Sequence, residues 1–136
     1  MISMICIDGS NHVMGRLASQ IAKMLLLGKE IYVVNAEKIV ISGKPKIVLD
    51  SFKERTARGD SYHGPFYPKR PDKVFRRVVR GMLPYKLQKG KQAFKRLKVF
   101  ISIPDELKGA EMTRVPKAEN KLRCKYVKLE ELWGKI

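Results

Sequence analysis

Residues 71–86 show the clearest separation of hydrophobic from polar positions in the chain. Pro71 and Asp72 are typical of a helix start, because proline lacks the N–H that would be unpaired there and the carboxylate faces the positive end of the helix dipole. The apolar stripe that we expect to be buried is Val74, Phe75, Val78, Val79 and Met82. The opposite side carries cations at helical spacing: Lys73, Arg76, Arg77 and Arg80. We therefore predict a helix that packs through one face, is basic on the other, and is ended by Gly81 and Pro84.

The pattern ahead of this helix predicts a β-α-β unit. Residues 4–8 and 31–34 are short apolar runs rich in isoleucine and valine, as expected of buried strands. Residues 13–28 place apolar side chains at helical spacing between them, with Ser10 or Asn11 as the expected N-cap. Two strands joined through a helix should lie parallel in one sheet, with a right-handed crossover.

A third strand, a second helix and a loop are expected next. Residues 39–42 are strand-like, although a parallel pairing with 31–34 would leave an unusually short connection. Residues 46–58 are expected to be helical, and 59–71 form a loop because glycines and prolines recur there. The helix should point Ile47, Val48 and Phe52 inward and Lys53, Arg55 and Arg58 outward. Aromatic side chains of the loop could stack on bases or could hold the loop against the core: Tyr62, His63, Phe66 and Tyr67.

The remaining pattern completes an α/β domain. Its elements are a basic helix over 91–97, a strand over 99–103, an irregular arm over 105–125 and a short terminal helix over 126–133. The basic helix should bury Ala93, Phe94 and Leu97 and expose Lys91, Lys95 and Lys98, and the terminal helix should dock through Val127, Leu129, Leu132 and Trp133. Alternating strands and helices favour a mostly parallel sheet within a core domain of residues 1–103, with 104–136 as a C-terminal extension docking on it.

The distribution of charge indicates a polyanion as the partner. The chain has 136 residues, enough for one domain, and a formal net charge of +16. Residues 44–98 hold seventeen basic and four acidic residues, a net of +13, whereas 1–43 and 99–136 carry only +1 and +2. Charge of one sign at this density repels itself unless a polyanion neutralises it. Nucleic acid is favoured over an anionic membrane, and a merely solvated basic surface is the third alternative.

Groups for catalysis or metal binding are scarce. Cys6 and Cys124 are far apart and lack a C-x-x-C partner, and His12 and His63 belong to no catalytic signature. We therefore expect neither a disulfide nor a metal site. The start of the chain lacks the basic region of a secretory signal, and the longest apolar run is far too short to span a membrane.

One class of enzyme stays open as an alternative. Gly9 and Gly15 flank the turn from the first strand into the first helix, where backbone amides could hold a phosphate. Their spacing does not match the dinucleotide fingerprint, and Asn35 stands where a ribose-binding acid would be expected. A nucleotide-dependent α/β enzyme is therefore the alternative to a nucleic-acid-binding protein.

The basic residues favour binding of phosphates in a folded RNA. Lysine and arginine neutralise phosphates and release counterions, and arginine adds a planar fork that grips phosphate and stacks on exposed bases. The chain has no zinc-finger, basic-zipper or RNP signature, so sequence-specific reading of DNA is not indicated.

Four motifs resemble those of a known family. They are GRLAS at 15–19, VNAEK at 34–38 with SGK at 42–44, VRGMLP at 79–84, and RLKVF at 96–100. In this order and spacing they are similar to the large-subunit ribosomal protein thirteen family, of the archaeal and eukaryotic type. The resemblance runs from about residue 4 to residue 100, and RGMLP ahead of a basic helix is its most specific part. The 44–72 region lacks the Tyr/His/Gly pattern of bacterial members, which favours the archaeal kind.

The resemblance implies a three-layer α/β/α domain around a four-stranded parallel sheet. It further implies binding to large-subunit ribosomal RNA, entry early in subunit assembly, and a cytoplasmic location in the large subunit beside other subunit proteins. It implies no enzymatic activity, no cofactor and no small-molecule substrate, and we expect no homo-oligomer. The candidate RNA contacts are Arg16, Lys44, Lys46, Lys53, Arg55, Arg58, Lys69, Arg70, Lys73, Arg76, Arg77, Arg80, Lys86, Lys89, Lys91, Lys95, Arg96 and Lys98.

Overall fold

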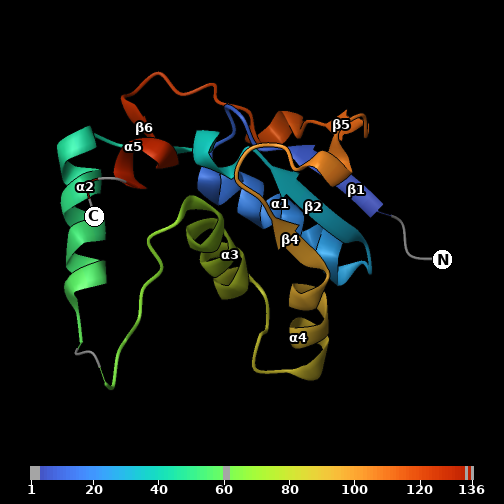
Figure 1. Ribbon diagram of the computed structural model, residues 1–136, viewed down its shortest axis with the longest axis horizontal. Helices are drawn as coiled ribbons and strands as arrows, with labels where there is room; N and C mark the ends of the chain where they lie inside the picture. Colours follow the sequence, from blue (N-terminus) through green and yellow to red (C-terminus); the bar gives the residue numbers. More distant parts are fainter. Residues whose placement is uncertain (1–3, 60–61, 134, 136) are drawn as a thin grey trace.

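A four-stranded parallel sheet forms the centre of the computed structural model, which describes residues 4–59, 62–133 and 135 (Figure 1). The strands, in sheet order, are β4 (Leu97–Val99), β2 (Glu30–Val34), β1 (Met4–Asp8) and β5 (Met112–Thr113). α1 (Met14–Leu26) connects β1 to β2, as the hydrophobic pattern predicts. The expected β-α-β unit is therefore confirmed.

Alternation along the strands divides the core into two layers. Ile7, Ile31 and Val33 belong to the main hydrophobic cluster, which also contains the buried faces of α1 and α3 (Pro71–Met82). Cys6 and Val34 belong to a smaller cluster that includes Leu107 of the 3-10 helix η2 (Asp105–Leu107). The sheet is thus covered on both faces, and the expected α/β fold class is confirmed.

The start of α1 differs from the prediction. Its N-cap residue is Val13, which makes no side-chain capping hydrogen bond, so the expected caps Ser10 and Asn11 are wrong. Asn11 has a left-handed conformation with φ of 59°, and the Ser10 N–H donates to Asp8 Oδ1 at 2.9 Å. Both residues therefore belong to the turn between β1 and α1, which precedes the N-cap residue Val13.

The third predicted strand exists but lies outside the main sheet. β3 (Val40–Ser42) pairs antiparallel with β6 (Tyr126–Lys128) in a separate two-stranded sheet. The short 3-10 helix η1 (Ala36–Lys38) follows β2 directly, and a parallel neighbour needs a longer crossover than this connection supplies. β5, from the segment expected to be irregular, completes the main sheet by pairing with β1.

The strand expected over 99–103 is shifted toward the N-terminus. α4 (Gln88–Lys95) ends before Leu97, so Leu97 is the first residue of β4 and the prediction that it belongs to the basic helix is wrong. Leu97 and Val99 are both buried, with the exposed Lys98 between them. This period of two, placed beside β2, decides for a strand.

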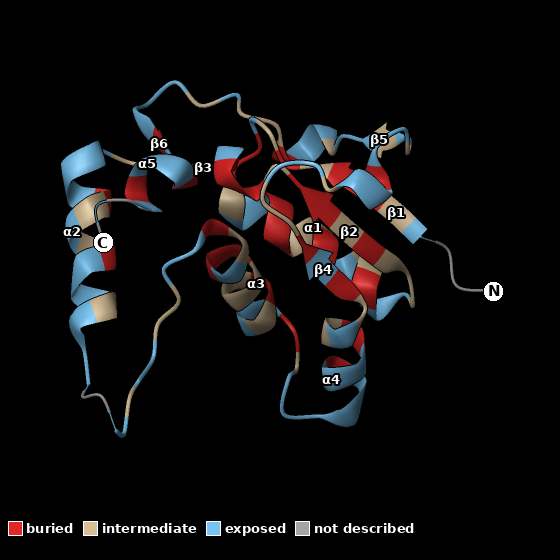
Figure 2. Ribbon diagram, in the orientation of Figure 1, coloured by how far each residue is buried: buried red, intermediate tan, exposed pale blue. Residues whose placement is uncertain are grey.

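Three side chains predicted to face the core are exposed. They are Ile47 in α2 (Pro45–Ala57), Met82 at the end of α3, and Trp133 at the end of α5 (Leu129–Trp133). α2 stands at one end of the molecule and buries only a narrow strip, Val48 and Phe52, as Figure 2 shows. The other two residues are the last of their helices, where the chain is already leaving the packed surface. At 126–133 the predicted helix is in fact β6 followed by α5.

Residues 104–136 are irregular over much of their described length, yet they supply β5 and β6. The division of the chain at residues 103 and 104 stays a prediction. None of the helices in the described parts of the chain is long and apolar enough to cross a bilayer.

Gly90 fixes the distance between α4 and the turn that precedes it. A methyl group at Gly90 would collide with the carbonyl of Pro84. We expect Gly90→Ala to lower the free energy of unfolding by roughly 1–3 kcal/mol, since overpacking at backbone forces the two segments apart. Urea denaturation followed by circular dichroism measures this change.

The matched control is Gly81→Ala in α3. Among the described residues, nothing outside its own helical turn lies within 4 Å of the methyl group that alanine adds there. Because alanine favours helix over glycine, the control should be neutral or stabilising by up to about 1 kcal/mol. Equal destabilisation by the two substitutions would contradict the close approach at Gly90.

Candidate nucleic-acid interface

α3 carries the row of cations that the spacing predicts. Its buried face consists of Pro71, Val74, Phe75 and Val79 and packs against α1. Lys73 on the other side is exposed, whereas the guanidinium-bearing residues are half-buried: Arg76, Arg77 and Arg80. The amphipathic helix is confirmed, and the half-burial shows that the arginines are held in place by neighbours.

Each of these three arginines lies over an aromatic ring. The Cζ atom of Arg76 is 4.5 Å from the ring centroid of Phe94. The corresponding distances are 5.7 Å for Arg77 over Tyr67 and 4.8 Å for Arg80 over Tyr85. A cation over a ring face is attracted by the ring quadrupole, which restricts the guanidinium before any ligand binds. These pairings were not predicted from the sequence, although the alternation of arginines with aromatic residues in the basic tract was a signal for them.

Tyr67 attaches the segment 62–70 to the helices α2 and α3. Its ring meets that of Phe52 edge-on, with the centroids 6.1 Å apart, and Arg55 of α2 lies 5.9 Å from the Tyr67 centroid. For Tyr67, the structure supports the alternative in which the aromatic holds the loop against the protein. Tyr62 and Phe66 are 88% and 67% exposed, so stacking of these two on bases stays a prediction.

The cations of α4 and β4 lie beside those of α3. Lys95 and Lys98 line a hollow of about 410 Å³ together with Lys73 and Arg76. Lys91 is exposed on α4, as are Lys86 and Lys89 just before and within its first turn. The fold therefore joins two basic segments that are separate in the sequence into one cationic surface.

The cations of α2 reach the same surface at one point. Arg55 and Arg58 line a cavity of about 260 Å³ with Arg77 of α3. Arg58 also pairs with Glu54 at 2.7 Å, but both side chains are largely exposed, so solvent screens this pair. Lys44, Lys46 and Lys53 are exposed along α2, which stands apart from α4 in Figure 1.

The four other candidates have different surroundings. Arg96 is half-buried and donates from Nη2 to the carbonyl oxygen of Leu25 at 2.6 Å, so it closes the end of α1. Arg70 is 3.5 Å from the carboxylate of Asp72. Arg16 is exposed in the first turn of α1, and Lys69 is exposed in the loop. Their roles as RNA contacts stay predictions, and Arg96 already has a structural role.

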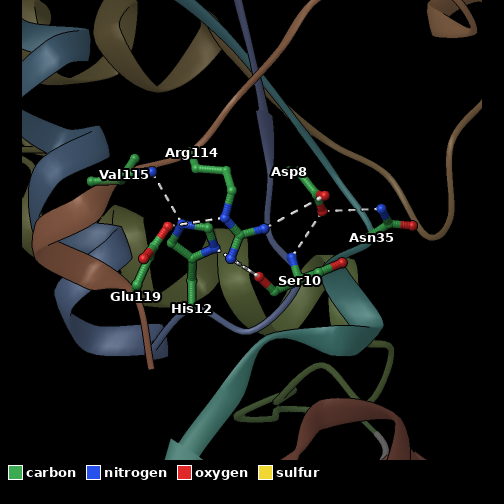
Figure 3. Close-up of polar contacts among 7 residues, drawn as sticks. All are labelled: Asp8, Ser10, His12, Asn35, Arg114, Val115 and Glu119. Atoms are coloured by element: carbon green, nitrogen blue, oxygen red, sulfur yellow. Dashed lines mark hydrogen bonds and ion pairs between the residues drawn. The ribbon is translucent and has the colours of Figure 1, made fainter. Parts of the chain in front are cut away.

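A polar cluster fills the edge where β1 and β2 end (Figure 3). Arg114 is at its centre: Nε donates to Glu119 at 3.0 Å, Nη2 donates to the Ser10 carbonyl at 3.0 Å, and Nη1 lies 3.8 Å from the Asp8 carboxylate. Asn35 donates to Asp8 at 3.1 Å. Enzymes with open α/β sheets bind ligands at this edge. Here it is used to attach the C-terminal segment to the turn after β1.

His12 is fully buried next to this cluster. Its Nδ1 lies 3.0 Å from the Ser10 carbonyl oxygen, and its Nε2 accepts a hydrogen bond from the Val115 N–H at 3.1 Å. This pair of contacts fits a neutral ring with its proton on Nδ1. Burial, and then the charge of Arg114, lower the pKa of His12 below its ordinary value. Burial opposes ionisation of Asp8, but hydrogen bonds from Ser10 and Asn35 and the charge of Arg114 lower the pKa of that carboxyl overall.

Within residues 4–59, 62–133 and 135, no three side chains of His, Cys, Asp or Glu come together as a metal site would require. Cys6 is buried and Cys124 is exposed, and both are free thiols. The chemistry visible in the described residues is that of charge and stacking.

Fold and surface together define an α/β domain with a preorganised cationic face. The sequence model of the family described as Ribosomal protein L13 matches residues 2–106. This match covers more than half of the chain, so the chain belongs to the ribosomal protein L13 family. The resemblance drawn from the four motifs is thereby confirmed.

Three similar proteins each bear the name large ribosomal subunit protein uL13. The one from Methanosarcina barkeri is 46% identical over 136 residues, covering 98% of this chain and 97% of its own. That from Archaeoglobus fulgidus is 46% identical over 129 residues, covering 93% and 83%, and that from Methanopyrus kandleri is 49% identical over 115 residues, covering 83% and 72%. These are ribosomal proteins from archaea, so the expectation of a non-enzymatic protein of the archaeal kind is confirmed.

The buried His12 should make the stability of the fold depend on pH. Because its pKa is lowered in the folded state, the unfolded chain takes up the proton first as the pH falls. The free energy of unfolding should therefore decrease below about pH 6.5, by up to about 1.4 kcal/mol per pH unit. Urea denaturation at several pH values measures the slope.

The control for this slope is His12→Gln, since the glutamine oxygen can still accept from the Val115 N–H while it does not titrate. The slope should flatten at pH values above the acid range in which the carboxyls of Glu119 and Asp8, whose pKa values are lowered in the folded state, bind protons. An unchanged slope in His12→Gln would assign the pH dependence to other groups.

Proposed function

We propose that this chain is a structural component of the large ribosomal subunit that binds large-subunit ribosomal RNA through its cationic face. The observation that carries the proposal is the set of three arginines on α3, each over an aromatic ring. In this view the protein joins the subunit early in assembly, in the cytoplasm, and meets neighbouring subunit proteins there. The names of its relatives support the ribosomal role.

The arrangement of the arginines suits RNA phosphates for an entropic reason. A free arginine side chain loses about 2 kcal/mol of rotamer entropy when it is fixed on a ligand. On α3 part of that entropy is already lost in the free protein, because the aromatic rings hold the guanidinium groups. The N–H groups at the edges of a guanidinium still match the fork geometry of a phosphate.

The extent of the cationic face suits a folded RNA more than a small anion. Its cations come from α2, α3, α4 and β4, so a ligand that touches all of them has to be as large as the domain itself. A compact RNA presents phosphates on several strands at such spacings. Binding by many phosphates also makes affinity fall steeply with salt.

The first experiment tests the assignment to the ribosome. In a sucrose gradient of cell extract, the chain should sediment with large subunits at low salt and should be released only by high salt. A chain that stays at the top of the gradient, together with saturable binding of a free nucleotide, would contradict the proposal and favour the enzyme alternative.

A second experiment measures how many phosphates the lysines neutralise. Lys73, Lys91 and Lys95 are exposed, so their replacement by glutamine removes charge without disturbing the core. For binding to purified large-subunit RNA, the plot of log affinity against log salt should become less steep by about 2 to 3, at roughly 0.7–0.9 for each phosphate that is no longer neutralised.

The control for this experiment is a second triple variant with the same reduction in charge. Lys23, Lys117 and Lys121 are also exposed but lie outside the 44–98 tract. Their replacement by glutamine should leave the slope nearly unchanged. Equal changes in the two triple variants would show that the RNA responds to net charge and not to the cationic face.

A further inference from the structure

A cavity of about 520 Å³ lies between the end of α3 and the outer face of α4. This volume is within the roughly 300–1,000 Å³ typical of sites that bury a small organic molecule. Its lining combines one arginine, two aromatic rings, two glutamines and two lysines: Arg80, Tyr85, Gln88, Lys91, Gln92, Phe94 and Lys95. Among the described residues, no acidic side chain contributes to it.

Arg80 and Tyr85 form a stacked wall of this cavity. The Arg80 Cζ atom is 4.8 Å from the Tyr85 ring centroid, and Tyr85 is 39% exposed. Both groups are planar, and the guanidinium of Arg80 lies over the face of the Tyr85 ring. Nucleic-acid bases stack on such planes as well as on aromatic rings.

The glutamines add neutral hydrogen-bonding groups. Gln88 and Gln92 are one helical turn apart on α4, so their amides lie on the same side of the helix as Lys91 and Lys95. Both glutamines are exposed. A side-chain amide has donors and acceptors that match the edge of a base, whereas a phosphate needs only donors. Two amides beside a stacking wall are more than phosphate binding alone would require.

The two lysines of the cavity are placed to contact the phosphates on either side of a bound nucleotide. Lys91 and Lys95 are exposed cations at the cavity, and an unpaired nucleotide carries a phosphate on either side of its sugar. Phe94 supplies an apolar wall beneath Arg76. Stacking plane, base-edge partners and flanking cations are therefore together in one cavity.

We propose that this cavity holds one unpaired nucleotide of the RNA, with its base stacked on the Arg80–Tyr85 wall and its edge bound by Gln88 and Gln92. The inference rests on the proposed RNA-binding function and adds a place where a base is recognised. The rest of the cationic face binds phosphates whatever the sequence, but this cavity would select a point in the RNA where a base is free of its helix.

The test probes the RNA in large subunits that carry either the wild-type chain or a variant. Dimethyl sulfate and a carbodiimide together report the exposed edges of all four bases, and hydroxyl radicals report the backbone. In Arg80→Lys the charge is kept but the stacking plane is removed. The reactivity of one or two unpaired bases should rise by about fivefold or more, the smallest change expected when one stacking partner is lost. The backbone footprint outside the cavity should persist, because the other cations of the face are intact.

The double variant Gln88→Ala with Gln92→Ala should expose the same base without any change in charge. If Arg80→Lys fails to enter the subunit, the double variant still tests whether the cavity holds a nucleotide, since both glutamines are exposed and away from the core. The matched controls are Arg123→Lys and Gln20→Ala, which lie outside the cavity and should leave base reactivity as in the wild type.

The outcomes separate this inference from the proposed function. If the chain is in the subunit, its backbone footprint is present and neither variant changes the reactivity of any base, the cavity holds no nucleotide and only the inference fails. If the wild-type chain leaves no footprint on large-subunit RNA, the proposed function fails and the inference with it.

Discussion

The packing of α3 against α1 determines where the cations of the basic tract can lie. Phe75, a large and fully buried side chain, fixes the rotation of α3 about its axis. That rotation places Arg77 over Tyr67 of the loop and Arg76 over Phe94 of α4. The segments on both sides of α3 are thus positioned relative to it. An apolar contact in the core therefore sets the geometry of a charged surface.

The aromatic rings hold the arginines in position without the loss of positive charge that salt bridges would cause. Acids placed beside the arginines would hold them in position, but they would also cancel the positive potential that the proposed RNA binding requires. A ring restricts a guanidinium through its quadrupole and leaves the net charge as it was. Arg114 shows the contrast, because that arginine, between Asp8 and Glu119, is neutralised and has a structural role.

The hydrophobic pattern of the sequence predicted the elements that depend on residues close together in the chain. The start of α3 at Pro71, its buried face and the strand pair β1–β2 follow from periodicity and from the helical crossover between those strands. The pairings of β5 with β1 and of β6 with β3 could not be predicted from the sequence, since strands of two or three residues are too short to be recognised reliably and their partners are distant in the chain. The cavity beside α4 was equally hidden, because it forms only where Arg80 and Tyr85 meet residues of α4 in three dimensions.

The pairing of β1 with β5 also has a consequence for synthesis of the chain. Cys6 is aligned with Met112, so the sheet stays one strand short until β5 has left the ribosome that makes the chain. The seventeen cations of residues 44–98 emerge before the strands β5 and β6. For that interval the nascent chain is a polycation with an open sheet edge, the form most prone to bind any nucleic acid nearby. Pairing of β5 with β1 and the hydrogen bond of Arg114 to Ser10 then complete the four-stranded sheet.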